Sequence, residues 1–183
     1  TIATIDFQSN GDSKGNIVLA SIGGVLDRNF ADTNHKFMYI PVIGEDGNIW
    51  LNNNLGAHYS NINHGSYNPN QQATAHNDHL AYGSLYQWGR YSDGHELINW
   101  TNATSGTPVN STTFTNATTD TPVDGLFILE SSDPEDWRVP QNNALWQSET
   151  AVNNPCPQDY RIPTEQEYIN LRATNAANIT NYA

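Results

Sequence analysis

The chain has 183 residues and a mass of 20.3 kDa, enough for one ordinary domain or for a small domain with an appended segment. It carries 19 acidic and 7 basic side chains, a formal net charge of -12, which argues against nucleic acid or an anionic membrane as a partner. The aromatic fraction of 10% is too high for a disordered chain, and no apolar run is long enough for membrane insertion.

Uncharged side chains supply most of the polarity, because charged residues make up only 14% of the sequence. Asn, Thr, Ser and Gln dominate, as is common in secreted bacterial proteins. The chain begins at Thr1 without a basic segment followed by an apolar one, which fits a processed chain. We therefore expect an extracellular or cell-surface location.

Residues 1–35 are predicted to form an N-terminal β arm or the end of a preceding module. Two strand-like pieces, Ile2–Phe7 and Ile17–Ile22, flank the turn-forming stretch 9–15. A second hairpin follows, since the aromatic and β-branched run Lys36–Ile43 is connected by a polar turn at 45–48 to Ile49–Leu51.

The next segment, residues 56–79, is polar and is predicted to be a surface loop. It contains four histidines, His58, His64, His76 and His79. A zinc site needs a closed set of ligands held by ordered elements, so a polar surface is favoured over a metal site. After this loop, residues 82–90 place Leu85 and Trp88 on one helical face and predict a short aromatic helix.

Residues 99–121 are nearly all Thr, Asn, Ser, Gly and Pro, and are predicted to be a low-complexity insertion that cannot bury a core of its own. This segment also contains several Asn-X-Ser/Thr triplets, the acceptor sequence for N-glycosylation. Such triplets arise by chance in an Asn- and Thr-rich chain, but their clustering keeps N-glycosylation as a hypothesis. The sequons begin at Asn99, Asn102, Asn110, Asn116 and Asn178.

A short apolar strand is expected at Leu126–Leu129, followed by an acidic stretch. Asp133, Glu135 and Asp136 could offer oxygen ligands to Ca²⁺. They do not match the spaced ligands of a calcium loop, so a solvated acidic turn is favoured and calcium is kept as the alternative.

The clearest helix start lies near the C-terminal end. Thr164 and Glu167 are three residues apart and form a capping box, in which each side chain satisfies the other's backbone N–H. Tyr168 and Leu171 then share one face, which predicts a short helix that docks an apolar stripe. Upstream, prolines flank Cys156, the only cysteine, and hold the backbone extended.

Three segments in order resemble the Fibrobacter succinogenes major paralogous domain. Ile43-Gly44 with Trp50–Leu55 resembles the opening signature of that family, and residues 82–88 resemble its central aromatic motif. The stretch 156–171, with Cys-Pro and Arg-Ile-Pro-Thr, is similar to its cysteine-proline signature. The departures are three asparagines between Trp50 and Leu55, tyrosines in place of the usual tryptophans, and the 99–121 insertion.

This resemblance implies an α+β, C-type-lectin-like fold with short helices, long loops and small sheets, related to formylglycine-generating enzymes. The lectin-like domain would span 36–183 and be incomplete at its C-terminal end. In the family a second cysteine follows and is expected to pair with the position of Cys156, so an open sheet edge is expected here.

Four of the five tryptophans divide into two predicted groups. Trp50 and Trp88 lie inside the family motifs among apolar neighbours, and are predicted to be core residues. Trp137 and Trp146 lie among polar residues and are predicted to be an exposed pair that could stack on a sugar.

No catalytic motif supports an enzyme. There is no nucleophile elbow, no phosphate-binding glycine loop, and only one cysteine where formylglycine-generating relatives need a pair. We expect a noncatalytic module of a bacterial surface, without a cofactor apart from the calcium alternative, that binds carbohydrate or protein. The second interpretation is a structural subunit of an extracellular fibre or surface layer, which would assemble with copies of itself by strand addition and carry glycans.

Overall fold

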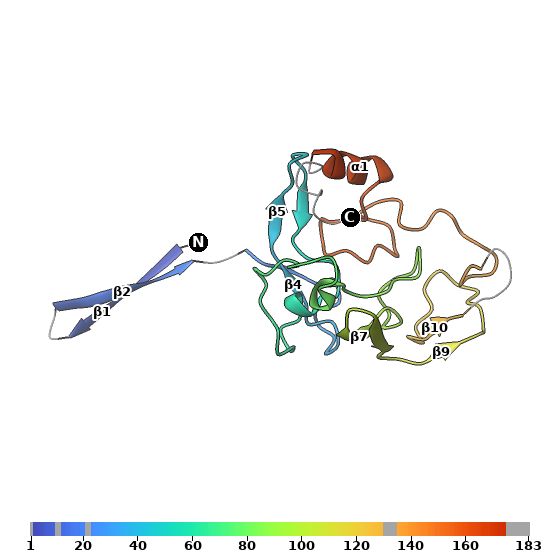
Figure 1. Ribbon diagram of the computed structural model, residues 1–183, viewed down its shortest axis with the longest axis horizontal. Helices are drawn as coiled ribbons and strands as arrows, with labels where there is room; N and C mark the ends of the chain where they lie inside the picture. The colour runs from blue at the N-terminus through green and yellow to red at the C-terminus, as the bar shows by residue number, and fades with distance from the viewer. Residues whose placement is uncertain (1, 10–11, 21–22, 130–134, 175–183) are drawn as a thin grey trace.

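The computed structural model describes residues 2–9, 12–20, 23–129 and 135–174. These residues contain one α-helix, two 3-10 helices and ten short strands, and the strands pair into five separate two-stranded sheets (Figure 1). The mixed α+β class is therefore confirmed. The C-type-lectin-like topology stays a prediction.

The N-terminal arm is a β-hairpin. Strand β1 (Ile2–Ser9) pairs antiparallel with β2 (Asp12–Ala20), with one irregularity between Phe7 and Gln8. The hairpin projects away from the rest of the chain (Figure 1). The predicted strands are thus present, and the connection between them is shorter than the predicted stretch 9–15.

The body of the protein starts earlier than the sequence indicated. Strand β3 (Val25–Leu26) pairs antiparallel with β4 (Met38–Tyr39), and the backbone N–H of Asp27 donates to Phe37 O at 3.0 Å. Residues 25–35, which the prediction placed in the arm or in a preceding module, are therefore bonded to the body.

The second predicted hairpin is confirmed. Strand β5 (Pro41–Ile43) pairs antiparallel with β6 (Ile49–Leu51), and the Gly44 N–H donates to Asn48 O at 2.8 Å to close the turn. Gly47 adopts a φ of +82° in this turn, a conformation that costs glycine little because it has no Cβ.

The predicted helix over residues 82–90 is wrong. A 3-10 turn, η2 (His79–Ala81), precedes this segment, and another, η1 (His58–Ser60), lies in the polar loop. Residues 83–88 have no helical structure, because Gly83 and Gly89 adopt φ values of +82° and +78°. A Cβ at Gly83 would lie 2.4 Å from Leu55 O, so the backbone at this position packs closely against the segment that contains Leu55. This contact replaces the hydrogen bonds that a helix would form within residues 82–90.

The low-complexity insertion is ordered. Strand β7 (Ile98–Asn102) pairs antiparallel with β8 (Ser105–Pro108), and β9 (Thr112–Thr113) pairs parallel with β10 (Phe127–Ile128), which confirms the predicted strand near residue 127. Trp100 anchors the hairpin, because its indole N–H donates to Gly83 O at 2.7 Å.

Two small apolar clusters form the core instead of one continuous layer. Each centres on three buried side chains, and only the first cluster joins distant parts of the chain, since it packs Leu97 against β4. The first cluster comprises Phe37, Tyr39 and Leu97, and the second comprises Ile128, Trp137 and Leu145.

The predicted capping box is confirmed at helix α1 (Glu165–Thr174). The Thr164 N–H donates to Glu167 Oε2 at 2.8 Å, and the Glu167 N–H donates to Thr164 Oγ1 at 3.2 Å. The predicted docking of the apolar stripe is only partial, since Tyr168 is 59% exposed and Leu171 is partly buried. Neither α1 nor any other helix in the described part of the chain is long and apolar enough to cross a bilayer.

Loss of the cap should destabilise α1. Thr164→Ala is expected to lower the free energy of unfolding by about 1 kcal/mol, the usual cost of losing an N-cap hydroxyl. Hydrogen bonds from Arg161 and Thr164 lower the pKa of Glu167 to about 2 from 4.5. The contribution of the ionised Glu167 carboxylate to the free energy of unfolding is therefore complete above about pH 4.5 and is lost as the pH falls toward 2.

Urea denaturation measured at neutral pH and at acidic pH, each followed by helical circular dichroism, checks both statements. Glu167→Gln should remove the part of the acid dependence that this carboxylate contributes. An unchanged acid dependence in that variant would contradict the assignment.

Candidate functional site

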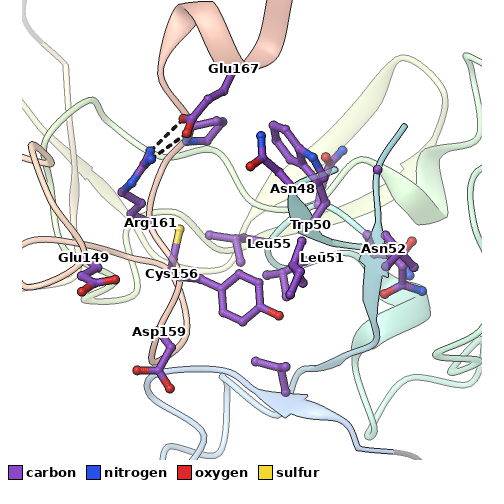
Figure 2. Close-up of a pocket in the computed structure, with 18 of the residues that line it drawn as sticks. Asn48, Trp50, Leu51, Asn52, Leu55, Glu149, Cys156, Asp159, Arg161 and Glu167 are labelled. Atoms are coloured by element: carbon purple, nitrogen blue, oxygen red, sulfur yellow. Dashed lines mark hydrogen bonds and ion pairs between the residues drawn. The ribbon is translucent and has the colours of Figure 1, made fainter. Parts of the chain in front are cut away.

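An open groove of about 1470 Å³ lies between the β5–β6 hairpin, the segment 149–163 and helix α1. Figure 2 shows Trp50, Leu51 and Leu55 on one side, with Cys156, Arg161 and Glu167 on the other. All of β6 lines the groove, whereas β5 contributes only Val42. The groove therefore lies along β6.

The β6 edge has unused backbone groups. Hydrogen bonds join Gly44 N to Asn48 O and Asn52 N to Ile40 O, so the antiparallel alternation turns the peptide groups of Ile49 and Leu51 away from β5. Within the described residues, no backbone group of Ile49 or Leu51 has another partner on that side. This edge can accept a further strand.

The opposite edge of the same hairpin is blocked. Pro41 occupies an outward-facing position of β5, where a proline removes one donor without breaking the ladder to β6. Proline at an exposed edge is a common way to prevent unwanted strand pairing. The hairpin therefore has one protected edge and one open edge, and the open edge borders the groove.

Cys156 belongs to the groove floor and is 5% exposed. Burial raises the pKa of its thiol to about 12, so the sulfur is protonated at neutral pH and is a poor nucleophile. Arg28 Nε donates to the Cys156 carbonyl at 2.8 Å and fixes the backbone there. The thiol is free within the described residues, and its pairing with a cysteine elsewhere stays a prediction.

The groove rim is polar and partly acidic. Arg161 bridges to the helix, with its two guanidinium nitrogens 2.9 and 2.7 Å from the Glu167 oxygens. Glu149 and Asp159 add negative charge on the same side (Figure 2). Because Arg161 is already paired with Glu167, the remaining positive charge along the groove is that of the exposed Arg28.

A buried network of charged side chains lies outside the groove. Arg90 is fully buried, and its Nη2 lies 2.7 Å from Asp93 Oδ2. The same guanidinium donates to Leu126 O at 2.8 Å and to Gln87 Oε1 at 2.9 Å. Burial alone would raise the pKa of Asp93, but hydrogen bonds from His95 and Arg90 outweigh burial and lower it.

Two histidines extend this network. The Gln87 N–H donates to His95 Nε2 at 3.1 Å, so this nitrogen is unprotonated, and Nδ1 donates its proton to Asp93 Oδ1 at 2.7 Å. His35 Nε2 lies 2.7 Å from Glu96 Oε1. Burial lowers the pKa of His35, but the hydrogen bond and charge of Glu96 outweigh it, so the pKa is raised overall.

Asp93, His95 and Glu96 are the one group of metal-ligating side chains that lies close enough together among the described residues. These residues do not fit a metal ion, since both nitrogens of His95 are engaged and the Arg90 guanidinium contacts Asp93. A bound cation would have to displace a buried positive charge. The cluster is a saturated hydrogen-bond network.

The predicted roles of Trp88 and Trp137 are reversed, and Trp50 and Trp146 are intermediate. Trp137 is 5% exposed and donates from its indole to Trp88 O at 2.7 Å, so the prediction of an exposed sugar-stacking Trp137 is wrong. Trp146 is partly buried, and its indole N–H donates to Asn153 O at 2.6 Å. Trp88, predicted as core, is 50% exposed and lies 6.0 Å from the Trp146 ring. Trp50 is partly buried, and its indole donates to Asp46 Oδ1 at 3.1 Å.

The four sequons of the insertion differ in how free the asparagine amide is. Asn99 and Asn102 are exposed. The Asn110 Nδ2 donates to Gly94 O at 3.0 Å, and the Asn116 Nδ2 donates to Asp136 O at 2.8 Å. Asn110 is exposed and Asn116 is partly buried. Because an N-linked glycan replaces only one of the two amide hydrogens, these bonds restrict how a sugar could be oriented at Asn110 and Asn116, and Asn99 and Asn102 are the less restricted positions.

The predicted calcium ligands are not tested as a set, because Asp133 lies outside the described residues. Glu135 is exposed, and Asp136 Oδ1 accepts the Arg138 N–H at 2.9 Å. Calcium stays a prediction. In the polar loop, His58 and His64 stack with their rings 4.1 Å apart, and burial lowers the pKa of His58.

Comparison of the chain with protein-family models, with curated proteins and with solved structures finds no match. The resemblance to the paralogous domain family therefore stays a prediction, and the site is interpreted from its own geometry.

Proposed function

We propose that this chain is a noncatalytic module of a bacterial cell surface or extracellular space that binds an extended protein segment in the groove beside β6. One observation carries this proposal: the outward peptide groups of Ile49 and Leu51 border an open, partly apolar groove. Backbone hydrogen bonds to such an edge supply affinity, and side-chain pockets on alternate positions supply specificity.

The chemistry of the ionisable groups supports a noncatalytic role. The thiol of Cys156 is held protonated by burial. In the cluster of Asp93, His95 and Glu96, His95 and Glu96 are buried, Asp93 is partly buried, and none of the three lines the groove. A catalytic acid or base needs access to its substrate. The groove instead offers apolar side chains and amides, which suit a peptide.

Carbohydrate is the second candidate ligand, and a different surface favours it. Trp88 is 50% exposed beside Trp146, and an exposed indole face suits the apolar face of a sugar ring. This site replaces the Trp137 and Trp146 pair suggested by the sequence. It lies outside the residues that line the groove.

A screen of short random peptides displayed on phage, followed by fluorescence titration of the selected peptides, tests the protein-binding proposal. We expect peptides with alternating apolar residues, and Ile49→Pro should weaken their binding about tenfold, because it removes one donor and places a ring at the edge. Ile43→Pro is the matched control. Ile43 is the ladder partner of Ile49, is 79% exposed and lies outside the groove.

Equal losses in the two proline variants would contradict binding at the β6 edge. A glycan array run in parallel separates the candidates. If no peptide is selected and a sugar signal disappears in Trp88→Ala, carbohydrate binding is the function and the peptide groove is not.

A further inference from the structure

Three histidines of the polar loop meet beside the two 3-10 turns. His58 lies in η1, His79 lies in η2, and His64 lies in the segment that connects them. The rings of His58 and His64 stack with their centroids 4.1 Å apart and their planes 25° apart. His79 is close enough for its charge to act on His58. We call these three residues the histidine cluster, and its assembly depends on the packing of η1 against η2.

The site of His58 suits only the neutral form of the ring. His58 is 7% exposed, and its Nδ1 is buried without a hydrogen-bond partner. The ring bonds to the Ile98 carbonyl in β7, and this bond uses Nε2 because Nδ1 has no partner. A neutral imidazole has one N–H, which the Ile98 carbonyl accepts. A protonated ring would place a second N–H in a buried position without an acceptor, which costs free energy.

Within the described part of the chain, no neighbouring group compensates a positive charge on His58. Strand β7 has no charged side chain, and the charged groups that act on His58 are His64 and His79, which repel a cation. The hydroxyl of Ser60 is also buried without a partner, so it does not reach Nδ1. Burial, and then the charges of the two other histidines, lower the pKa of His58.

The carboxylate at the N-cap of η2 is engaged elsewhere. Asp78 Oδ2 accepts hydrogen bonds from the Tyr59 hydroxyl at 3.1 Å and from the Thr74 N–H at 3.0 Å. Burial would raise the pKa of Asp78, but the hydrogen bonds from Thr74 and Tyr59 outweigh burial and lower it. Asp78 therefore keeps its charge above about pH 4. The contact between Tyr59 in η1 and Asp78 does not change in the range where histidines titrate.

We propose that the histidine cluster is an acid-sensitive contact, which holds η1 against η2 at neutral pH and releases the segment 58–82 when its rings are protonated. A histidine with a lower pKa in the folded state than in the unfolded state stabilises the fold fully above the unfolded value of about 6.5. This stabilisation is lost as the pH falls through the folded value. The contact is thus intact at neutral pH and weakened in mild acid.

Release of this segment would reach the groove through the three asparagines that follow β6 and line the groove. Each donates its side-chain amide to a backbone carbonyl of the segment: Asn52 to Pro69 at 2.6 Å, Asn53 to Gln71 at 2.9 Å, and Asn54 to Ala81 at 3.1 Å. Mild acid would therefore free this part of the groove wall. The inference does not depend on which ligand the groove binds.

A histidine NMR titration of the full wild-type chain between about pH 8 and pH 5 tests the proposal without a variant. We expect the His58 ring to carry its proton on Nε2 at neutral pH and to titrate below about 6.5. The side-chain amide signals of Asn52, Asn53 and Asn54 should shift in the same pH step. A His58 ring that titrates at or above about 6.5, or asparagine signals that do not follow it, would overturn the proposal.

Variants separate the histidine cluster from the other acid-dependent groups. His58→Gln can still donate to the Ile98 carbonyl but cannot take up a proton. As the pH falls from about 7.5 to about 5.5, its urea midpoint should therefore rise relative to that of the wild type. His64→Gln should raise the pH at which His58 titrates, because it removes a neighbouring positive charge. His76→Gln, at an exposed position of the same loop, is the matched control and should follow the wild type at each pH.

Hydrogen exchange, corrected for the intrinsic effect of pH on amide rates, locates the opening. Amides of the segment 58–82 should lose protection in mild acid in the wild type and keep it in His58→Gln. Amides of α1 should keep their protection in both, because Glu167 loses its charge only below about pH 4.5. Loss of protection throughout the chain at once, or equal loss in the wild type and His58→Gln, would contradict a local acid-sensitive contact.

Discussion

Replacement of Arg90 by Met is expected to lower the free energy of unfolding by about 3–5 kcal/mol, the usual cost of breaking a buried ion pair by removing one partner. The Arg90 side chain is fully buried and lies 2.7 Å from Asp93. The variant leaves that mostly buried carboxylate with less compensation for its charge. It also leaves the carbonyl of Leu126 without the donor it has at 2.8 Å.

A loss of this size is a large part of the stability of an ordinary domain, so the variant should unfold at much lower urea concentration. Arg172→Met is the matched control, because Arg172 is exposed in the last turn of α1 and should cost less than about 1 kcal/mol. A midpoint for Arg90→Met close to that of the control would mean that the network is not desolvated in solution.

Replacement of Trp137 by Ala is expected to cost about 3–5 kcal/mol, the range for deleting a buried aromatic side chain. The indole is 5% exposed, packs with Ile128 and Leu145, and donates its N–H to Trp88 O at 2.7 Å. Its removal opens a cavity in the second apolar cluster and leaves a carbonyl without its donor. The C-terminal half of the body should lose its packing first.

Trp88→Ala is the control, with an expected loss of about 1 kcal/mol, since half of that side chain is already in water and its main ring contact is with Trp146. Urea denaturation followed by circular dichroism measures both variants without depending on tryptophan emission. Quenching of fluorescence by iodide provides a second measure, because Trp88→Ala should remove quenchable emission and Trp137→Ala should not. A larger loss of stability in Trp88→Ala than in Trp137→Ala, or a loss of quenchable emission in Trp137→Ala and not in Trp88→Ala, would contradict the burial seen in the structure. Either result would support the sequence-based prediction that Trp88 is a core residue and Trp137 is exposed.

The parts of the fold that could be predicted are those whose causes are local. The β5–β6 hairpin follows from a turn that contains Gly47 between two β-branched runs, and its register needs only the residues beside the turn. The capping box of Thr164 and Glu167 joins residues three apart, so its hydrogen bonds depend on no distant segment. The N-terminal hairpin was predictable for the same reason.

The parts that could not be predicted depend on distant segments. Residues 82–90 carry a helical spacing of apolar side chains, but Gly83 packs against Leu55 and Trp100, and these tertiary contacts override the local preference. The insertion 99–121 lacks apolar residues for a core of its own, yet it is ordered because Trp100 reaches Gly83. Neither contact can be inferred from the order of apolar and polar residues within these two segments.

The sequence carries only a partial signal of the buried network. Arg90, Asp93, His95 and Glu96 lie within seven residues, a dense cluster for a chain with only 7 basic side chains. The spacing alone does not show whether such a cluster is solvated or buried. Gln87 and Leu126 supply backbone hydrogen-bond partners to His95 and Arg90. These hydrogen bonds offset part of the free-energy cost of burying the charged side chains.

The sequence by itself therefore determined the charge, two hairpins and the capped helix, because composition and short-range hydrogen bonding set these features, and the α+β class was expected from the family resemblance. Only the tertiary structure decided which tryptophans are buried, which sequons are free, and that an open strand edge borders a groove. Burial depends on what packs against a side chain, and an edge is open only when no distant strand covers it. Both are properties of the folded arrangement of segments that the chain order does not encode locally.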